Sequence, residues 1–434
     1  MIRPGQALAL CVLALLCIGV VMVNSADMSV TGVAGSAGPS VTAGPSLDAA
    51  PEMAPVTRAE SVTLRSILAS RTTVYLGLAV LALGVGYFFP VRAVSWRLSR
   101  PLDPPRGLRG INGRGTLVKL AAVSVLLVGV TLLAYAPVIG KEVNGAYRWL
   151  RLPVPGLGDA LSVQPSEIVK WSLVAVVAWY GATRAAFMHR FWTGLVPALV
   201  AVGAVSAVVV LEDLGTGVLI AAASCVVLVA AGARVWQFLM LLPFAGAGLA
   251  AAIISNPYRI ERIRSFVDPY GDPEGSGYHM IQSMLAVMGG EGPGRGLGHG
   301  LQKFGYLPED RTDFLFAVIC EELGIAGAAV VIFLFVGMVW AGVSIARRER
   351  EVFLRLSALG LVSTIALQAL MNLAVVTGLG PTKGIALPLV SSGGTGWILT
   401  AFSMGILAAI DRTQPDGEAS EDVLRDGGEL SGAA

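Results

Sequence analysis

Long uninterrupted runs of apolar residues alternate with shorter polar stretches along most of the chain. A membrane-spanning helix needs about 20 apolar residues, and ten runs come near that length. They cover residues 7–23, 72–89, 117–138, 168–182, 191–211, 214–231, 235–254, 314–344, 353–376 and 395–410. Because the runs do not alternate apolar with polar positions, they predict helices rather than the strands of a β-barrel. The pattern therefore predicts an all-α polytopic membrane protein with ten transmembrane helices.

The composition supports this interpretation and excludes several other classes of protein. Of the 434 residues, 55% are hydrophobic and only 14% are charged, whereas a soluble domain carries about 25% charged residues. The net charge of +2 gives no reason to expect a nucleic-acid partner. The four cysteines lie in apolar stretches without C-x-x-C spacing and the three histidines are far apart, so we predict no metal site.

The arginines predict the orientation in the membrane, because cytoplasmic loops carry an excess of Lys and Arg. The densest basic stretches are residues 91–115 and 346–355. If all ten runs cross the membrane, these stretches share a side with both termini, which we therefore predict to be cytoplasmic. The segments predicted to lie outside are 139–167, 255–313 and 377–394.

The chain divides into a first helix, an insertion, a membrane core and a tail. The run 7–23 ends at an Asn-Ser-Ala sequence, as a signal peptide does, but its 17 residues exceed the usual signal core of about 7–15. Residues 1–26 are therefore predicted to remain as the first transmembrane helix. Residues 27–65 are rich in Ala, Gly, Ser, Pro and Thr and contain no aromatic residue, which is typical of a flexible extracytoplasmic insertion. Residues 66–411 form the core with nine further helices, and 412–434 form a cytoplasmic tail.

Acidic residues occur at or inside the apolar runs, where an ionisable side chain is costly and is usually functional or paired. Asp313 opens the run that starts at residue 314. It is either a half-shielded catalytic carboxylate or an aspartate that the helix dipole favours near a helix start. Glu321 and Glu322 lie about 12 Å deeper at the helical rise, so each needs a partner, and they either brace a site or fix helix packing. Glu212 and Asp213 interrupt an apolar run and are predicted to be solvated turn residues.

Other polar residues recur on single faces of apolar helices. Thr364, Gln368 and Asn372 are spaced four apart, so they share one face and point to a bundle interior, for helix packing or for a cavity. Lys170 lies one turn into its run, where a lysine either extends to the headgroups or takes part in a site.

The predicted outer segment 255–313 is too long for a plain connector, and such loops are usually functional or disordered. Residues 278–288 predict a short interfacial helix. Its expected apolar face consists of Met280, Ile281, Met284, Leu285 and Met288. The glycine-rich residues 289–300 are a candidate for binding phosphate through backbone N–H groups, although they match no nucleotide-binding motif.

Motifs in a fixed order then identify a resemblance. They are residues 21–26, 144–149, 164–167 with Lys170, 213–216, 307–316, 321–324, Asn372, 376–378, 381–384 and 387–394. In order and spacing the chain resembles the SEDS family (shape, elongation, division and sporulation), the polytopic peptidoglycan polymerases typified by FtsW and RodA. Residues 302–309 and 381–384 look more like the division and sporulation members than like RodA. Two departures are Arg311, where many members have His, and Ser392, where many have Tyr.

The resemblance implies an enzyme that polymerises lipid II into β-1,4-linked glycan strands on the outer face of the bacterial cytoplasmic membrane, at the division septum. The essential aspartate of the family's T-D-F-x-F motif maps to Asp313. It would act as general base while a sugar hydroxyl attacks an anomeric carbon and a lipid pyrophosphate leaves. Cations would stabilise the departing pyrophosphate. The predicted substrate-binding residues are Arg148, Trp149, Lys170, Glu167, Lys383, Ser391, Asn372 and Gln368.

The family also implies partners. These are lipid II, a class B penicillin-binding protein that acts as transpeptidase, other division proteins and the membrane itself. No cofactor is certain, and a divalent cation is the one candidate. Two other functions stay open: a lipid II flippase, and a scaffold that has lost catalysis. The cytoplasmic halves of the predicted helices are nearly uncharged apart from Lys119, which favours an enzyme working at the outer face over a flippase.

Overall fold

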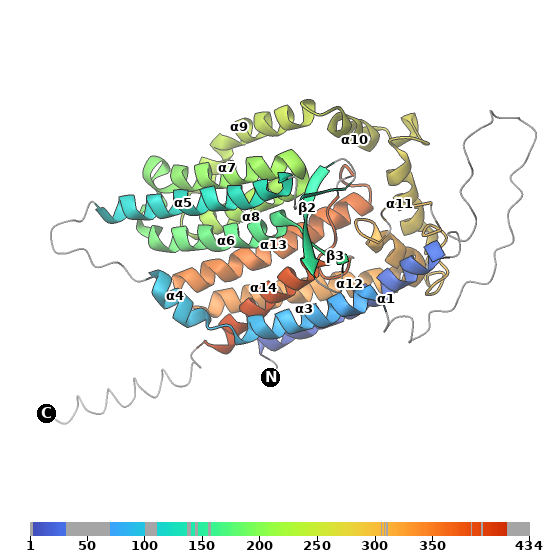
Figure 1. The fold of residues 1–434 in the computed structure, drawn as a ribbon, viewed down its shortest axis with the longest axis horizontal. Helices are drawn as coiled ribbons and strands as arrows, with labels where there is room; N and C mark the ends of the chain where they lie inside the picture. The colour runs from blue at the N-terminus through green and yellow to red at the C-terminus, as the bar shows by residue number, and fades with distance from the viewer. Residues whose placement is uncertain are drawn as a thin grey trace, which may run out of the picture.

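The molecule is a bundle of long helices that run roughly along one axis (Figure 1). The computed structural model describes residues 3–31, 70–99, 111–136, 140–143, 146–154, 158–304, 306–307, 309, 311–382, 384–391 and 394–414. All ten apolar runs are helical within these residues. The corresponding helices are α1 (Pro4–Thr31), α3 (Arg71–Phe88), α5 (Ile111–Leu132), α6 (Pro165–Thr183), α7 (Val196–Glu212), α8 (Leu214–Ala230), α9 (Val235–Ile254), α12 (Leu315–Arg348), α13 (Val352–Val376) and α14 (Thr395–Arg412).

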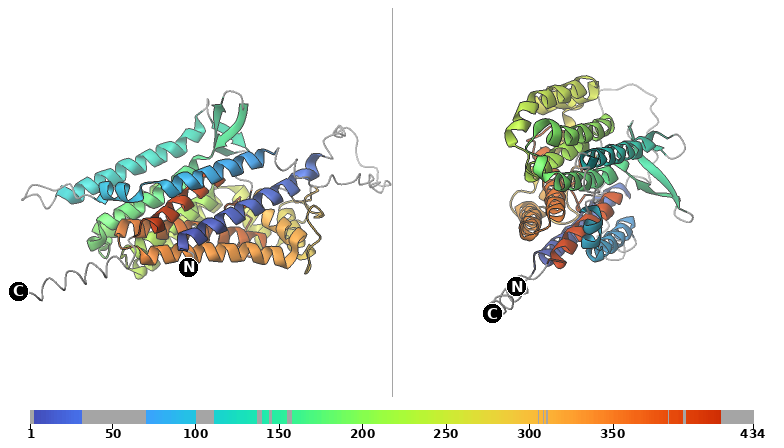
Figure 2. Two further views of the ribbon diagram at one scale, coloured as in Figure 1. Left: turned by 90° about the horizontal axis from the view of Figure 1, so that it is seen from below. Right: turned by 90° about the vertical axis from the view of Figure 1, so that its left-hand side faces the viewer.

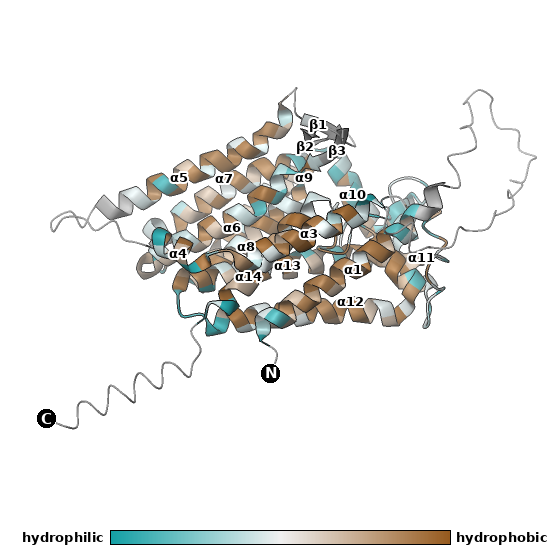
Figure 3. Ribbon diagram, turned by 60° about the horizontal axis from the view of Figure 1, so that its bottom comes forward, coloured by the Kyte–Doolittle hydropathy of each residue, from teal (hydrophilic) through white to brown (hydrophobic). Residues whose placement is uncertain are grey.

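The apolar character of these helices confirms a multi-pass membrane protein. Seven helices of the described ranges are long and apolar enough to cross a membrane, namely α1, α3, α5, α7 with the turn before it, α9, α12 and α13. Figure 3 shows hydrophobic residues along most of their length and hydrophilic residues around α4 (Val91–Ser99) at one end and near α10 (Pro257–Val267) at the other. The full count of ten spans and the cytoplasmic location of the termini stay predictions.

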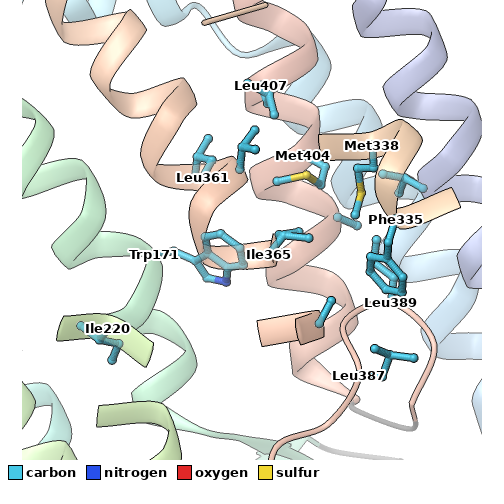
Figure 4. Packing of buried hydrophobic residues seen from close by; sticks show 14 of the residues in the cluster. Trp171, Ile220, Phe335, Met338, Leu361, Ile365, Leu387, Leu389, Met404 and Leu407 are labelled. Atoms are coloured by element: carbon cyan, nitrogen blue, oxygen red, sulfur yellow. The ribbon is translucent and has the colours of Figure 1, made fainter. Parts of the chain in front are cut away.

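The core lies where α13 packs against α6, α8 and α12, and where α14 joins α1 and α3. Figure 4 shows Ile365 of α13, Met404 of α14 and Phe335 of α12 in one cluster, with Leu387 and Leu389 of the α13–α14 connection close by. Lipid is as apolar as these side chains, so close packing rather than hydrophobic burial holds such helices together. The α13–α14 connection is thus part of the core.

Glycine allows α3 and α14 to approach backbone to backbone. A Cβ added at Gly86 would lie 2.3 Å from the Phe402 carbonyl oxygen, and one added at Gly405 would lie 2.3 Å from that of Leu83. Small residues at helix crossings are the usual solution in membranes, because they increase van der Waals contact.

Polar groups gather at the two ends of the bundle. At one end, the Asp411 carboxylate accepts from Gly5 N at 2.9 Å, and Arg92 of α4 pairs with Glu349 at 2.9 Å. Gln414 donates to the Ile345 carbonyl there at 3.0 Å. The described ends of the chain therefore share this end with α4. The described parts of the three segments predicted to lie outside, one of which is the α13–α14 connection, are at the opposite end (Figure 1).

The sequence did not predict a small sheet, nor the helices α4 and α10. The strands β1 (Gly140–Val143), β2 (Ala146–Val154) and β3 (Gly158–Val163) form an antiparallel sheet in that order. Both views of Figure 2 place it beside α5, and the left view shows it at the end of α5 remote from α4. The strands β1 and β3 have only four and six residues, and β2 contains Pro153, so their pattern was not distinguishable from that of a loop.

The predicted interfacial helix exists as α11 (Tyr278–Gly289), but its buried face differs from the predicted one. Met280 is buried as expected, together with Ser283 and Ala286. Leu285 and Met288 are exposed, the latter by 73%. The Ser283 hydroxyl donates to the Val376 carbonyl at 2.9 Å, so a hydrogen bond to the end of α13 fixes the rotation of α11.

Candidate active site

Asp313 lies half-buried immediately before α12, as the sequence predicted. The turn before it is closed by Phe314 N, which donates to the Glu309 carbonyl at 3.3 Å. Across from it runs the backbone of the α13–α14 connection, so close that a Cβ added at Gly384 would lie 3.1 Å from Asp313 Oδ2. The carboxylate therefore faces a backbone position at which any added side chain would press on Asp313 Oδ2. Lys383, the residue before this glycine and a predicted substrate ligand, lies outside the described residues.

Asn372 of α13 ties the two sides of this site together. Its amide nitrogen donates to the Asp313 carbonyl and to the Ile385 carbonyl, both at 2.7 Å. The side chain is 1% exposed, and its Oδ1 is buried with no hydrogen-bond partner among the described residues. Asn372 thus holds the backbone of the base and the α13–α14 connection at a fixed separation.

Lys170 and Gln368 brace the same connection from behind. Lys170 Nζ donates to Glu167 Oε1 at 2.8 Å and to Gln368 Oε1 at 2.9 Å, and Gln368 Nε2 donates to the Ala386 carbonyl at 3.0 Å. Lys170 is only 1% exposed, so of its two predicted roles the headgroup contact is wrong. A buried lysine must be paired, and Glu167, one turn earlier in α6, supplies the pairing charge.

The polar stripe of α13 faces the bundle interior, as predicted, because Thr364, Gln368 and Asn372 are all buried. Ser391 is buried as well and folds the end of the connection. Its hydroxyl accepts from Leu387 N at 3.0 Å, and its carbonyl accepts from Trp397 Nε1 at 2.6 Å. Three of the predicted binding residues, Gln368, Asn372 and Ser391, thus bind the backbone of the α13–α14 connection.

Two predicted binding residues lie on the sheet, apart from this hydrogen-bonded group. Trp149 is half-buried in β2, opposite Lys141 of β1. Arg148 lies beside it in β2, and its side chain falls outside the described residues.

The Glu322 carboxylate holds the glycine-rich segment 289–300, and the Glu321 carboxylate holds the two residues that follow it. The Glu322 carboxylate accepts from Gly298 N at 3.0 Å and Gly300 N at 3.3 Å. Glu321 accepts from Leu301 N at 2.8 Å and from the amide of the next residue at 3.2 Å. The suggestion that the glycine-rich segment binds phosphate is wrong for Gly298 and Gly300, because Glu322 already occupies these two backbone donors. The prediction that each of the two glutamates needs a partner is confirmed.

The turn at Asp213 supports the connection from a third side. Asp213 caps α8 by accepting from Thr216 N at 3.0 Å and Thr216 Oγ1 at 2.7 Å. A Cβ added at Gly215 would lie 2.6 Å from Ile385 Cδ1. This confirms a turn at Asp213, but the prediction that this residue is solvated is wrong, because Asp213 is only 8% exposed. Its carboxylate caps the start of α8, against which the connection packs.

Two residues outside the predicted site contact the segments on either side of Asp313. Arg262 of α10 donates from Nη1 to the Thr382 carbonyl at 2.8 Å. His279 of α11 stacks on Phe314, with ring centroids 6.3 Å apart and planes at 26°. Burial and the nearby Arg262 lower the pKa of His279 below its ordinary 6.5, while Glu309 acts in the opposite direction. The available signal was a histidine and an arginine in the long outer segment, but nothing in the sequence places them beside the aspartate.

The lowered pKa of His279 predicts acid sensitivity. Well above pH 6.5 both the folded and the unfolded chain carry neutral His279, so it contributes no pH dependence there. As the pH falls below this value, the unfolded chain binds the proton first and stability is lost. We expect His279→Gln to reduce the loss of thermal stability between pH 7.5 and pH 5.5, by about 2 °C. His299→Gln is the control, since His299 is exposed, and an equal reduction in both variants would contradict the assignment.

Comparison with known proteins gives a consistent result. Residues 115–415 match the family model of the FtsW/RodA/SpoVE cell cycle proteins. A probable peptidoglycan glycosyltransferase FtsW of Halomonas elongata is 40% identical over 291 residues, which are 66% of this chain and 72% of that protein. Stage V sporulation protein E of Bacillus subtilis is 38% identical over 281 residues, 64% of this chain and 75% of that protein.

Two solved structures share the fold. One is a chain of a peptidoglycan synthase complex that coordinates polymerization and crosslinking, with a TM-score of 0.58, 28% identity, and coverage of 79% of this chain and 88% of that chain. The other is the rod shape determining protein RodA of Thermus thermophilus, with a TM-score of 0.57, 23% identity, and coverage of 94% and 97%.

Proposed function

The chain belongs to the FtsW/RodA/SpoVE family and is a peptidoglycan glycosyltransferase, and from this premise we propose that Asp313 is the general base with which it polymerises lipid II. The single observation that carries the proposal is the place of this carboxylate. It is half-buried at the start of α12, against the Gly384 backbone and among residues that fix its position. A base held in this way can approach an acceptor hydroxyl without losing its orientation.

The reaction makes one bond and breaks one bond. The 4-hydroxyl oxygen of the acceptor sugar forms a bond to the anomeric carbon of the donor, and the bond from that carbon to the lipid pyrophosphate breaks. Asp313 takes the hydroxyl proton, and the pyrophosphate carries the bonding electron pair away. Positive groups must stabilise the departing charge. We assign this task to Arg148 and Lys383, with Trp149 as a contact to the sugar or lipid.

The buried residues that the sequence predicted as substrate ligands bind other groups of the protein instead. Lys170 already balances the charge of Glu167 and binds Gln368, and Asn372 and Ser391 bind backbone groups. We propose that they keep the α13–α14 connection in place opposite Asp313. Within the described ranges no three residues among His, Cys, Asp and Glu come together as metal ligands, so the side chains there do not build a metal cage, and no step proposed here passes through a divalent cation.

We place the Asp313 end of the bundle outside the cytoplasmic membrane. The opposite end carries α4 with Arg92 and Arg97, and the Arg347 and Arg348 end of α12. Arginines of this kind are retained on the cytoplasmic side. We further propose a class B penicillin-binding protein as partner and the division septum as the site of action, in line with the complex that coordinates polymerization and crosslinking.

The test is polymerisation of lipid II by the purified protein, alone and with the transpeptidase, with glycan strands separated by length on a gel. We expect strands from the wild type. Translocation of lipid II across vesicles without strand synthesis would instead support the flippase, and neither activity would support the scaffold.

Gly384→Ala is expected to lower the polymerisation rate about tenfold with little loss of stability. Its Cβ would stand 3.1 Å from Asp313 Oδ2, so the carboxylate must shift by a few tenths of an ångström. Gly380→Ala in the same connection is the control, because its Cβ would meet nothing nearer than 3.7 Å. Equal rates in the two variants would show that the Gly384 backbone does not position the base.

A further inference from the structure

The end of α1 contacts the segment around Asp313 at two separate points. Near the surface, Asp27 Oδ1 lies 2.6 Å from Arg311 Nη1, and the two side chains are 41% and 35% exposed. Deeper, the Ser25 hydroxyl binds both carboxylate oxygens of Glu322, at 2.8 Å and 3.0 Å. Asp27 thus binds the residue two positions before the proposed base, and Ser25 binds the residue nine positions after it.

Lys303 completes the deeper contact. Its Nζ lies 2.6 Å from Glu322 Oε1 and donates to the Ser25 carbonyl at 3.2 Å and the Ser25 hydroxyl at 3.1 Å. The side chains of Lys303 and Glu322 are 2% and 0% exposed. One helix end therefore binds the chain upstream of Asp313, through Lys303, and downstream of it, through Glu322.

Between Lys303 and the start of α12, the described residues form turns rather than a helix or strand. Leu307 N donates to the Gln302 carbonyl at 2.8 Å and Thr312 N to the Glu309 carbonyl at 3.1 Å. Glu309 adopts a φ of +58°, which a non-glycine residue holds only where its surroundings impose it. A segment of turns keeps its shape through its anchors, so the position of Asp313 depends on what holds the residues beside it.

We propose that the end of α1 is a positioning element for the catalytic base, in which the Asp27–Arg311 ion pair fixes the turn that presents Asp313. This inference rests on the proposed function, because it takes Asp313 as the base. Asp27 touches neither substrate nor reacting atoms and acts through Arg311. The guanidinium is charged at every accessible pH, so the pair persists wherever Asp27 is ionised. The inference also requires that α1 remain attached in the mature enzyme.

The experiment measures kcat and KM for lipid II in Asp27→Asn, Arg311→Gln and the double variant. We expect each single variant to lower kcat about tenfold and to leave KM within about twofold. The double variant should lose no more than the worse single one, because both remove the same contact. Asp27→Glu keeps the charge and should retain most of the wild-type kcat.

The thermal unfolding midpoint distinguishes a positioning role of the Asp27–Arg311 pair from a role in folding. The pair is partly exposed, so the thermal unfolding midpoint should stay within about 2 °C of the wild type. Glu274→Gln, which neutralises an exposed carboxylate in the turn before α11, is the matched control and should leave kcat unchanged. The inference is overturned if Asp27→Asn keeps the wild-type kcat, if the two single losses add, or if kcat falls only together with the unfolding midpoint. A wild type without polymerase activity would instead refute the proposed function.

Discussion

Asp313→Asn is expected to lower the rate of lipid II polymerisation by about 10²- to 10⁴-fold, the usual contribution of a general base. The amide has nearly the same shape as the carboxylate but cannot take the proton of the acceptor hydroxyl. The hydrogen bond from Asn372 to this residue uses its backbone carbonyl, at 2.7 Å, and the substitution leaves that carbonyl intact. The loss should therefore appear in kcat, with a folded protein in the membrane.

The control for this prediction is the same change, from a carboxylate to an amide, at an acidic residue that takes no part in the proposed chemistry. Glu291→Gln suits this purpose, because Glu291 is exposed in the turn after α11. Its polymerisation rate should match the wild type. Initial rates are compared at equal amounts of purified protein, and thermal unfolding midpoints establish that the folds are equally stable. Polymerisation by Asp313→Asn at the wild-type rate would remove the aspartate from the mechanism.

The membrane helices could be predicted because the bilayer imposes a simple rule on sequence. A run of about 20 apolar residues has few other stable states in lipid, and all ten runs are helical in the structure. The same rule predicted that Gln368 and Asn372 face inward, because polar side chains on an apolar helix avoid lipid. These inferences need only neighbours along one helix.

Contacts between distant segments could not be predicted in this way. Gly298 and Asn372 show the limit. The glycine-rich segment looked like an anion site, and it does bind an anion, but the anion is Glu322 of the same chain at 3.0 Å from Gly298 N. Asn372 was a predicted substrate ligand, and in the structure it binds the carbonyls of Asp313 and Ile385. Periodicity shows which face of a helix a residue occupies but not which distant backbone group it meets.

Glu322→Gln is expected to destabilise the protein by about 3–5 kcal/mol, because it removes one charge of a buried ion pair and leaves the other uncompensated. Lys303 is 2% exposed and lies 2.6 Å from Glu322, so its ammonium group would keep the neutral carbonyl and hydroxyl of Ser25 but lose the charge of Glu322. The measurement is the thermal unfolding midpoint of detergent-solubilised protein, together with the amount that accumulates in the membrane. Both should fall clearly below the wild type.

Two comparisons show whether charge burial is the cause. Glu351→Gln neutralises a carboxylate 3.8 Å from Arg92 at the opposite end of the bundle, where the side chains are 32% and 34% exposed, and such a pair contributes only about 0–1 kcal/mol. The double variant Glu322→Gln/Lys303→Met removes both buried charges and should be more stable than Glu322→Gln alone, because no unpaired ion remains. If the double variant is less stable than the single one, the hydrogen bonds of the cluster outweigh its charge balance. If Glu322→Gln matches Glu351→Gln, the ion pair of Glu322 and Lys303 does not hold α1 and α12 together.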